Sequence, residues 1–85
     1  MTLTILGVDP GLTRCGFGVI TAVGTRVSFV DAGVIRTPAD APIEERLHAV
    51  WVSLSDLLDR YSPDAVAVER VYAQANVRTV MGTAQ

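Results

Sequence analysis

Two acidic residues, Asp9 and Glu69, each end an apolar run of the sequence. The first run covers residues 3–9 and is followed by a Pro-Gly turn, and the second covers residues 64–69. Carboxylate oxygens suit hard cations, and Mg²⁺ binds proteins through one or two carboxylates. Two such ions, about 3.5–4 Å apart, hold both the attacking water and the leaving oxygen of a phosphodiester. The pair predicts metal-dependent phosphodiester chemistry, whereas either acid alone also fits an ordinary turn or strand end.

The first acid is expected to sit in an antiparallel sheet. Residues 3–9, 15–22 and 26–36 have the composition of strands, and the short turns between them predict a three-strand meander. Gly16 and Gly18 lie inside the second of these strands. Glycine in a strand indicates a place where another backbone or a ligand approaches closely.

The second acid is expected to arrive beside the first through a helical crossover. A helix is predicted from about residue 41 to residue 61, with Asp40 as its N-cap, Pro42 in its first turn and Trp51 in the core. Residues 64–69 lack polar alternation, which is typical of a strand buried on both faces. A right-handed crossover makes this strand parallel to the first. Both acids then lie at neighbouring carboxyl ends, where open α/β sheets bind ligands.

Composition favours one small domain, residues 1–85, in the cytoplasm. The hydrophobic fraction of 49% suits a packed core, and no apolar run reaches the roughly 20 residues that span a bilayer. There is no secretory signal, and a lone cysteine excludes an internal disulfide. Arginine supplies every cation and the net charge is −2, which does not favour a nucleic-acid binder, so a stronger basic surface would have to come from elsewhere. Residues 74–85 have helical periodicity without a stop signal, which predicts a fragment.

Several segments together resemble the first half of the RuvC-type Holliday-junction resolvases. They are Leu6-Gly7-Val8-Asp9-Pro10-Gly11, Cys15-Gly16-Phe17-Gly18-Val19-Ile20, Ala67-Val68-Glu69-Arg70-Val71-Tyr72 and the helical stretch that begins at Asn76. The resemblance implies an RNase H-like mixed sheet: an antiparallel meander plus a parallel strand, with helices packed on the sheet, truncated here before the fifth strand. It also implies a homodimer that nicks four-way DNA junctions symmetrically in recombinational repair, with the branch-migration proteins RuvA and RuvB as partners.

The resemblance assigns roles to both acids. Asp9 takes the place of the first-strand metal ligand, and Glu69 takes the place of the ligand that follows it in the family's pattern. The cofactor implied is Mg²⁺, with Mn²⁺ as a substitute, as one or two ions. The family completes this site with acidic residues near the end of the domain, and this chain lacks them. We therefore expect water, activated at the metal, to attack the phosphodiester.

Four other residues are candidates for contact with DNA. Tyr72 is placed to stack on bases at an opened junction centre, and an ordinary loop or core aromatic is the alternative. Asn76 and Arg78 are candidates for phosphate contact, and a solvated helix start explains them about as well. Arg14, expected in the loop beside Asp9, is either a phosphate ligand or a plain surface arginine.

Three other functions remain compatible with the sequence. Actin-like kinases and ATPases also begin with a strand, an Asp and a Gly hairpin that cradles phosphates. Nucleases of the YqgF type, which act on ribosomal RNA precursors, share the first motif. The chain is also compatible with a catalytically incomplete fragment that binds DNA or dimerises without cutting.

Overall fold

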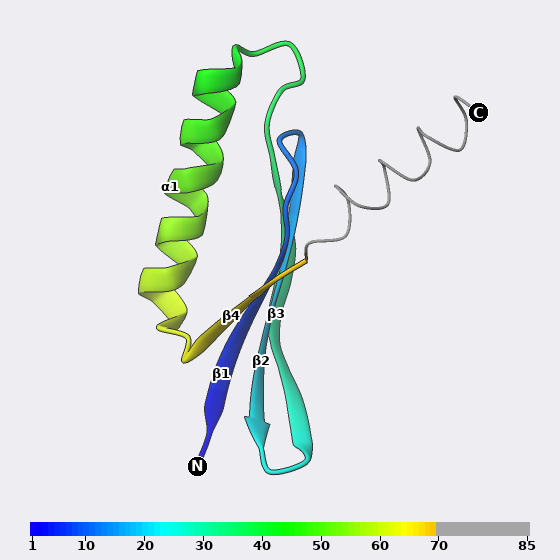
Figure 1. The fold of residues 1–85 in the computed structure, drawn as a ribbon, viewed down its shortest axis with the longest axis vertical. Helices are drawn as coiled ribbons and strands as arrows, with labels where there is room; N and C mark the ends of the chain where they lie inside the picture. Colours follow the sequence, from blue (N-terminus) through cyan, green and yellow to red (C-terminus); the bar gives the residue numbers. More distant parts are fainter. Residues whose placement is uncertain (70–85) are drawn as a thin grey trace, which may run out of the picture.

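The computed structural model describes residues 1–69, and it forms one mixed sheet with one helix (Figure 1). The elements are β1 (Leu3–Asp9), β2 (Arg14–Val23), β3 (Arg26–Arg36), α1 (Ile43–Tyr61) and β4 (Ala65–Val68). The strand order is β3-β2-β1-β4, with β4 parallel to β1 and the other pairs antiparallel. The predicted meander, crossover helix and parallel strand are confirmed. Residues 70–85, and with them the predicted helix 74–85, lie outside the described residues.

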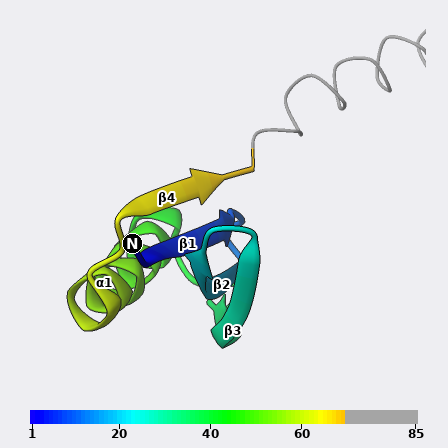
Figure 2. The same cartoon turned by 90° about the horizontal axis from the view of Figure 1, so that it is seen from below.

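Helix α1 lies on one side of the sheet (Figure 2), and both contribute buried side chains to a small core. Its buried apolar side chains are Leu6, Cys15, Val19 and Leu57. Leu6 of β1 lies directly opposite Val19 of β2, so both side chains point to the helix side. Period-two alternation then sends Gly7 and Asp9 of β1 to the other side of the sheet, which we call the open face.

Two expectations about burial are wrong. Strand β4 was predicted to be buried on both faces, yet all four of its residues are exposed, with Val68 at 60% exposure. The reason is its position at the edge of the described sheet, where β1 is its partner. Trp51 was predicted in the core and is 65% exposed. The apolar stripe of α1 is wider than its contact with the sheet, and the Trp51 ring stacks instead on His48.

The start of α1 also differs from the prediction. The helix begins at Ile43, and its N-cap position holds Pro42 rather than Asp40, with no side-chain cap. The Pro42 carbonyl accepts from the N–H groups of Glu45 and Arg46, which satisfies part of the first turn. No helix in residues 1–69 combines the length and apolar character needed to cross a membrane.

A hydrogen bond ties the last turn of α1 to β3 and predicts a pH dependence of stability. The Tyr61 hydroxyl donates to the Asp31 carboxylate, which lowers the pKa of Asp31 from its ordinary value of 3.8 and raises the pKa of Tyr61 from 10.0. The bond needs an ionised Asp31, so its contribution is present above pH 3.8 and is lost as the pH falls through the lowered pKa of Asp31. It also needs a protonated phenol, so it is lost as the pH rises through the raised pKa of Tyr61.

We expect Tyr61→Phe to lower the melting temperature of the chain between about pH 5 and pH 9, with the deficit shrinking below pH 3.8. Melting curves followed by circular dichroism across this range measure the difference. Asp56→Asn is the control, because its pair with Arg60 is exposed on the helix surface and such pairs contribute little. A deficit that stays constant from pH 7 to pH 3 would contradict the assignment.

Candidate active site

Asp9 and Glu69 are delivered by adjacent parallel strands whose register is held at both ends. At the start of the pair, the Asp64 N–H donates to the Thr4 carbonyl and the Thr4 N–H donates to the Asp64 carboxylate, both at 2.7 Å. At the other end, the Glu69 N–H donates to the carbonyl of Val8 at 3.1 Å. Glu69 thereby lies next to Asp9 across the strand pair, as the crossover predicts.

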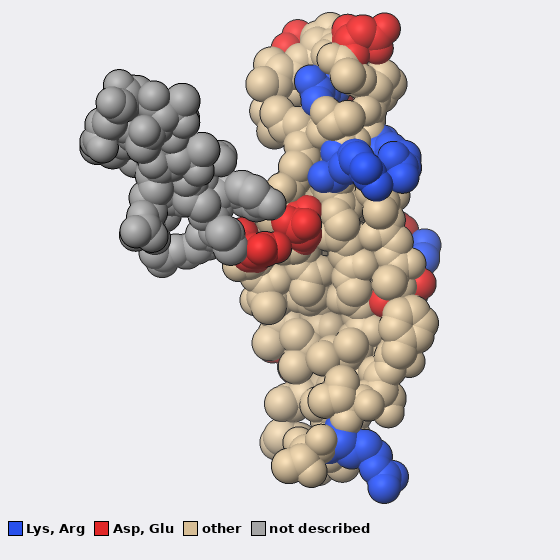
Figure 3. Space-filling model, turned by 90° about the vertical axis from the view of Figure 1, so that its right-hand side faces the viewer, with Lys and Arg blue, Asp and Glu red and all other residues tan. Residues whose placement is uncertain are grey.

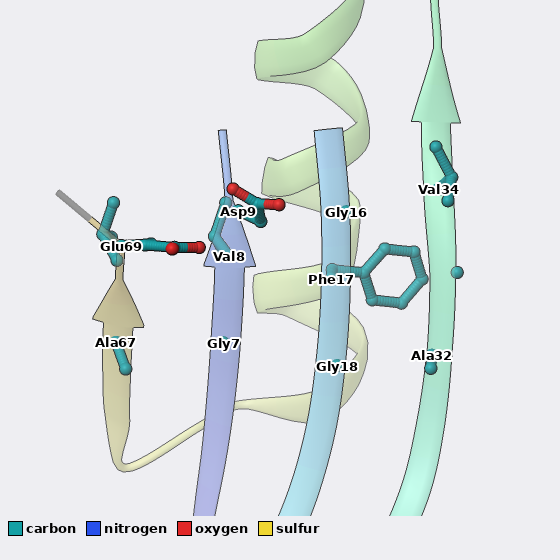
Figure 4. A pocket seen from close by; sticks show the side chains of 12 residues that line it. Gly7, Val8, Asp9, Gly16, Phe17, Gly18, Ala32, Val34, Ala67 and Glu69 are labelled. Atoms are coloured by element: carbon teal, nitrogen blue, oxygen red, sulfur yellow. The ribbon is translucent and has the colours of Figure 1, made fainter. Parts of the chain in front are cut away.

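The two carboxylates share the open face of the sheet and lie side by side (Figure 4). The Glu69 side chain extends from the end of β4 toward β1, where the Asp9 carboxylate lies at the strand end. Both residues are exposed. Neighbouring strands are about 4.8 Å apart, so carboxylates at adjacent ends can reach one cation.

In the floor beside the carboxylates, most open-face residues have little or no side chain, and Val34 is the exception. The floor forms an open depression of about 820 Å³, and its members on the open face include Gly7, Gly16, Gly18, Ala32 and Ala67. The chain is packed tightly at one point below it, because a Cβ on Gly33 would lie 2.8 Å from the Phe17 ring. Gly16 and Gly18 of the second strand lie in this floor, and the approach of another backbone or a ligand there stays a prediction.

The loop that follows Asp9 is fastened from the helix side by Thr37 and Arg46. The buried Thr37 hydroxyl donates to the carbonyl of Leu12, and the Thr37 N–H donates to the carbonyl of Thr13 at 3.1 Å. The Arg46 guanidinium donates to the hydroxyl of Thr13 at 2.6 Å and to that of Thr37 at 3.3 Å. These bonds hold the loop, and with it the end of β1, against helix α1.

The donor set of the site fits Mg²⁺ in part. Two carboxylates from adjacent strands are what this ion takes from a protein when water and phosphate oxygens supply its other ligands. No group of three or more His, Cys, Asp or Glu side chains able to hold a metal forms within residues 1–69. The described part of the chain therefore offers two carboxylates, and a second ion would need further ligands.

Of the four residues predicted to contact DNA, Arg14 is within the described part of the chain. Arg14 is the first residue of β2 rather than a loop residue, because the strand begins one residue earlier than expected. Tyr72, Asn76 and Arg78 lie outside the described residues. Arg36, which sequence reasoning passed over, lies directly opposite Arg14. The sequence gives no strong signal for this pairing, because the regular register of the predicted hairpin would place Ile35 opposite Arg14 and the pairing depends on a bulge in β3.

The family model of the crossover junction endodeoxyribonuclease RuvC matches residues 5–85. The chain belongs to the RuvC family. It is 62% identical over 84 residues to RuvC of Frankia alni and 60% identical over 84 residues to RuvC of Parafrankia sp.. Each match covers 98% of this chain. The match spans 43% and 47% of these two relatives, so the chain corresponds to less than half of their length.

Solved RuvC structures have the same fold. RuvC of Thermus thermophilus, in a complex with a Holliday junction substrate, superposes with a TM-score of 0.75 and 32% sequence identity over 80% of this chain and 42% of that one. The RNase H-like fold expected from the RuvC resemblance is confirmed.

Proposed function

We propose that this chain carries two metal ligands of a Mg²⁺-dependent endonuclease that resolves four-way DNA junctions by paired phosphodiester hydrolysis in recombination and repair. The observation that supports this most is the meeting of Asp9 and Glu69 on the open face, beside a floor made mostly of glycine and alanine. Membership of the RuvC family supports the substrate class and favours this function over the actin-like and YqgF-type alternatives.

In this proposal Asp9 and Glu69 hold Mg²⁺, or Mn²⁺ in its place, as one or two ions. A bound ion lowers the pKa of water and offsets charge on the phosphate. The carboxylates act as ligands and neither attacks the DNA. The floor of Gly7, Gly16 and Gly18 admits the sugar-phosphate backbone.

Further contacts complete the proposal. Arg14, Asn76 and Arg78 bind phosphates, and Tyr72 stacks on a base near the junction centre. Two symmetric cuts require two sites, which a homodimer supplies. Association with RuvA and RuvB and a cytoplasmic location belong to the same proposal.

The test measures cleavage by the 85-residue chain and by a chimera, in which this chain replaces the matching residues of Frankia alni RuvC. We expect the chimera to cut a mobile four-way junction in Mg²⁺, to stop when EDTA removes the metal, and to recover when Mg²⁺ returns. A chimera that ignores junctions but cleaves an RNA precursor, or that binds ATP in calorimetry, would contradict the proposal.

A second candidate is a fragment that binds DNA without cutting it. The observations that favour it are the two-carboxylate site of residues 1–69 and the match to less than half of each relative. It predicts junction binding without cleavage by the 85-residue chain, together with cleavage by the chimera.

A further inference from the structure

Arg14 and Arg36 lie directly opposite each other on the open face, at the end of the sheet that carries the carboxylates. They are Cα partners in the β2–β3 pair. The adjacent side chains of Thr13 and Thr37 accept hydrogen bonds from Arg46 on the helix side of the sheet. Because successive side chains of a strand point to opposite faces, Arg14 and Arg36 point to the open face. Figure 3 shows basic side chains gathered beside acidic ones on the surface that faces the viewer.

This pairing depends on an irregularity of the strands. The register of β2 and β3 shifts between Val19 and Ile20, where Val30 is left without a partner. A one-residue change of register turns every later side chain of a strand to the other face. In an unbulged ladder of the same residues, Ile35 would lie opposite Arg14, and Arg36 would face the helix side.

The pairing is unfavourable as long as nothing lies between the two cations. Like charges directly opposite each other on a sheet are destabilising. Both arginines are exposed, and within residues 1–69 the one ion pair found is Arg60 with Asp56, on the helix. A phosphate that accepts hydrogen bonds from both guanidinium groups would turn this repulsion into attraction, since arginine forks match phosphate oxygens.

The pair also stands in line with the carboxylates. Asp9 lies opposite Gly16, and Arg14 is two residues further along β2, on the same face. Arg14 is thus displaced from Asp9 by about 4.8 Å across the sheet and about 6.7 Å along it, which is the scale of the spacing between neighbouring phosphates of one DNA strand. A DNA strand with one phosphate at Asp9 and Glu69 would thus present a nearby phosphate to the arginine pair.

We propose that Arg14 and Arg36 together clamp one DNA phosphate, one or two nucleotides from the phosphate that is cut. This inference rests on the proposed junction cleavage and adds a second phosphate subsite to it. The clamp anchors the strand, so the scissile phosphate stays over the two carboxylates.

The experiment uses the chimera with Arg36→Ala, Arg36→Glu and Arg14→Ala. We expect each alanine variant to weaken junction binding about 10-fold or more, and to reduce the slope of log K against log salt by about 0.9. The double alanine variant should lose little more than either single variant, because both side chains hold one phosphate. Arg26→Ala, an exposed arginine at the far end of β3, is the matched control.

Two further measurements separate a phosphate clamp from a structural role. Arg36→Glu should bind the junction worst and yet melt about 1–4 °C higher than the parent, because it pairs with Arg14. A neutral methylphosphonate, placed in turn at each linkage within two nucleotides of the cut, should weaken the parent at one position and leave Arg36→Ala unaffected there.

The outcomes are distinguishable. If the parent chimera does not bind or cut junctions, the proposed function fails and the clamp fails with it. If the parent cuts but Arg36→Ala behaves like Arg26→Ala, the clamp alone is wrong. A lower melting temperature for Arg36→Glu, or additive losses in the double variant, would also overturn it.

Discussion

Replacing Asp9 by Asn is expected to abolish junction cleavage by the chimera while junction binding persists. The amide is nearly the same size as the carboxylate but is a poor ligand for Mg²⁺, which favours charged oxygen. Metal-assisted stabilisation is worth several kcal/mol, and 1.36 kcal/mol corresponds to a factor of ten, so the rate should fall by about 10³-fold or more. Single-turnover cleavage measures the rate, and gel shift in Ca²⁺ measures binding.

The corresponding amide substitution at Glu69 tests whether the two acids act as a unit. We expect Glu69→Gln to match Asp9→Asn, and the double variant to be no slower than either, because one ion depends on both ligands. Asp59→Asn, which alters an exposed acid on α1, serves as the control. An equal loss of binding and cleavage would show that the two carboxylates shape the DNA surface instead of holding the metal.

Replacing Leu6 by Ala is expected to cost about 2–5 kcal/mol of the free energy of unfolding. Leu6 is 1% exposed, and the buried apolar core of residues 1–69 has four members. A loss of this size approaches the whole stability of a small domain. Urea denaturation of the 85-residue chain should therefore show little folded protein for this variant.

Leu3→Ala is the control for this experiment, because Leu3 lies on the same strand with 41% exposure. Its midpoint should stay close to that of the parent. Similar losses for the two variants would mean that burial on β1 contributes less than the structure indicates.

The sequence predicted the arrangement of the two acids because that arrangement follows from short-range rules. Short turns force the meander, a helix between strands forces a parallel return, and alternation puts Asp9 on the face away from Leu6. The turn and alternation rules act within a few residues, and the crossover rule acts through the 19 residues of α1. The metal role of the acids stays a prediction, tested by the substitutions above.

The predictions that were wrong or missing depend on contacts between segments that are far apart in the sequence. Whether β4 is an edge strand depends on the other strands of the sheet and not on its own apolar run. The exposure of Trp51 depends on how much of α1 the sheet covers. The apolar stripe of the helix does not show how wide this covered area is. The Arg14–Arg36 pair depends on a one-residue bulge, for which a single sequence carries no strong signal.

The mutual bonds between Thr4 and Asp64 have a consequence for the length of the two strands. Asp9 lies five positions after Thr4, and Glu69 lies five positions after Asp64. The Thr4–Asp64 bonds fix the register of β1 against β4, and because both acids lie the same number of residues beyond this point, they end next to each other. Deleting any one residue of β4 would rotate Glu69 toward the helix, however conservative the deletion looked. The alignment of the two acids therefore depends on the length of the two strands more than on the identity of the residues between.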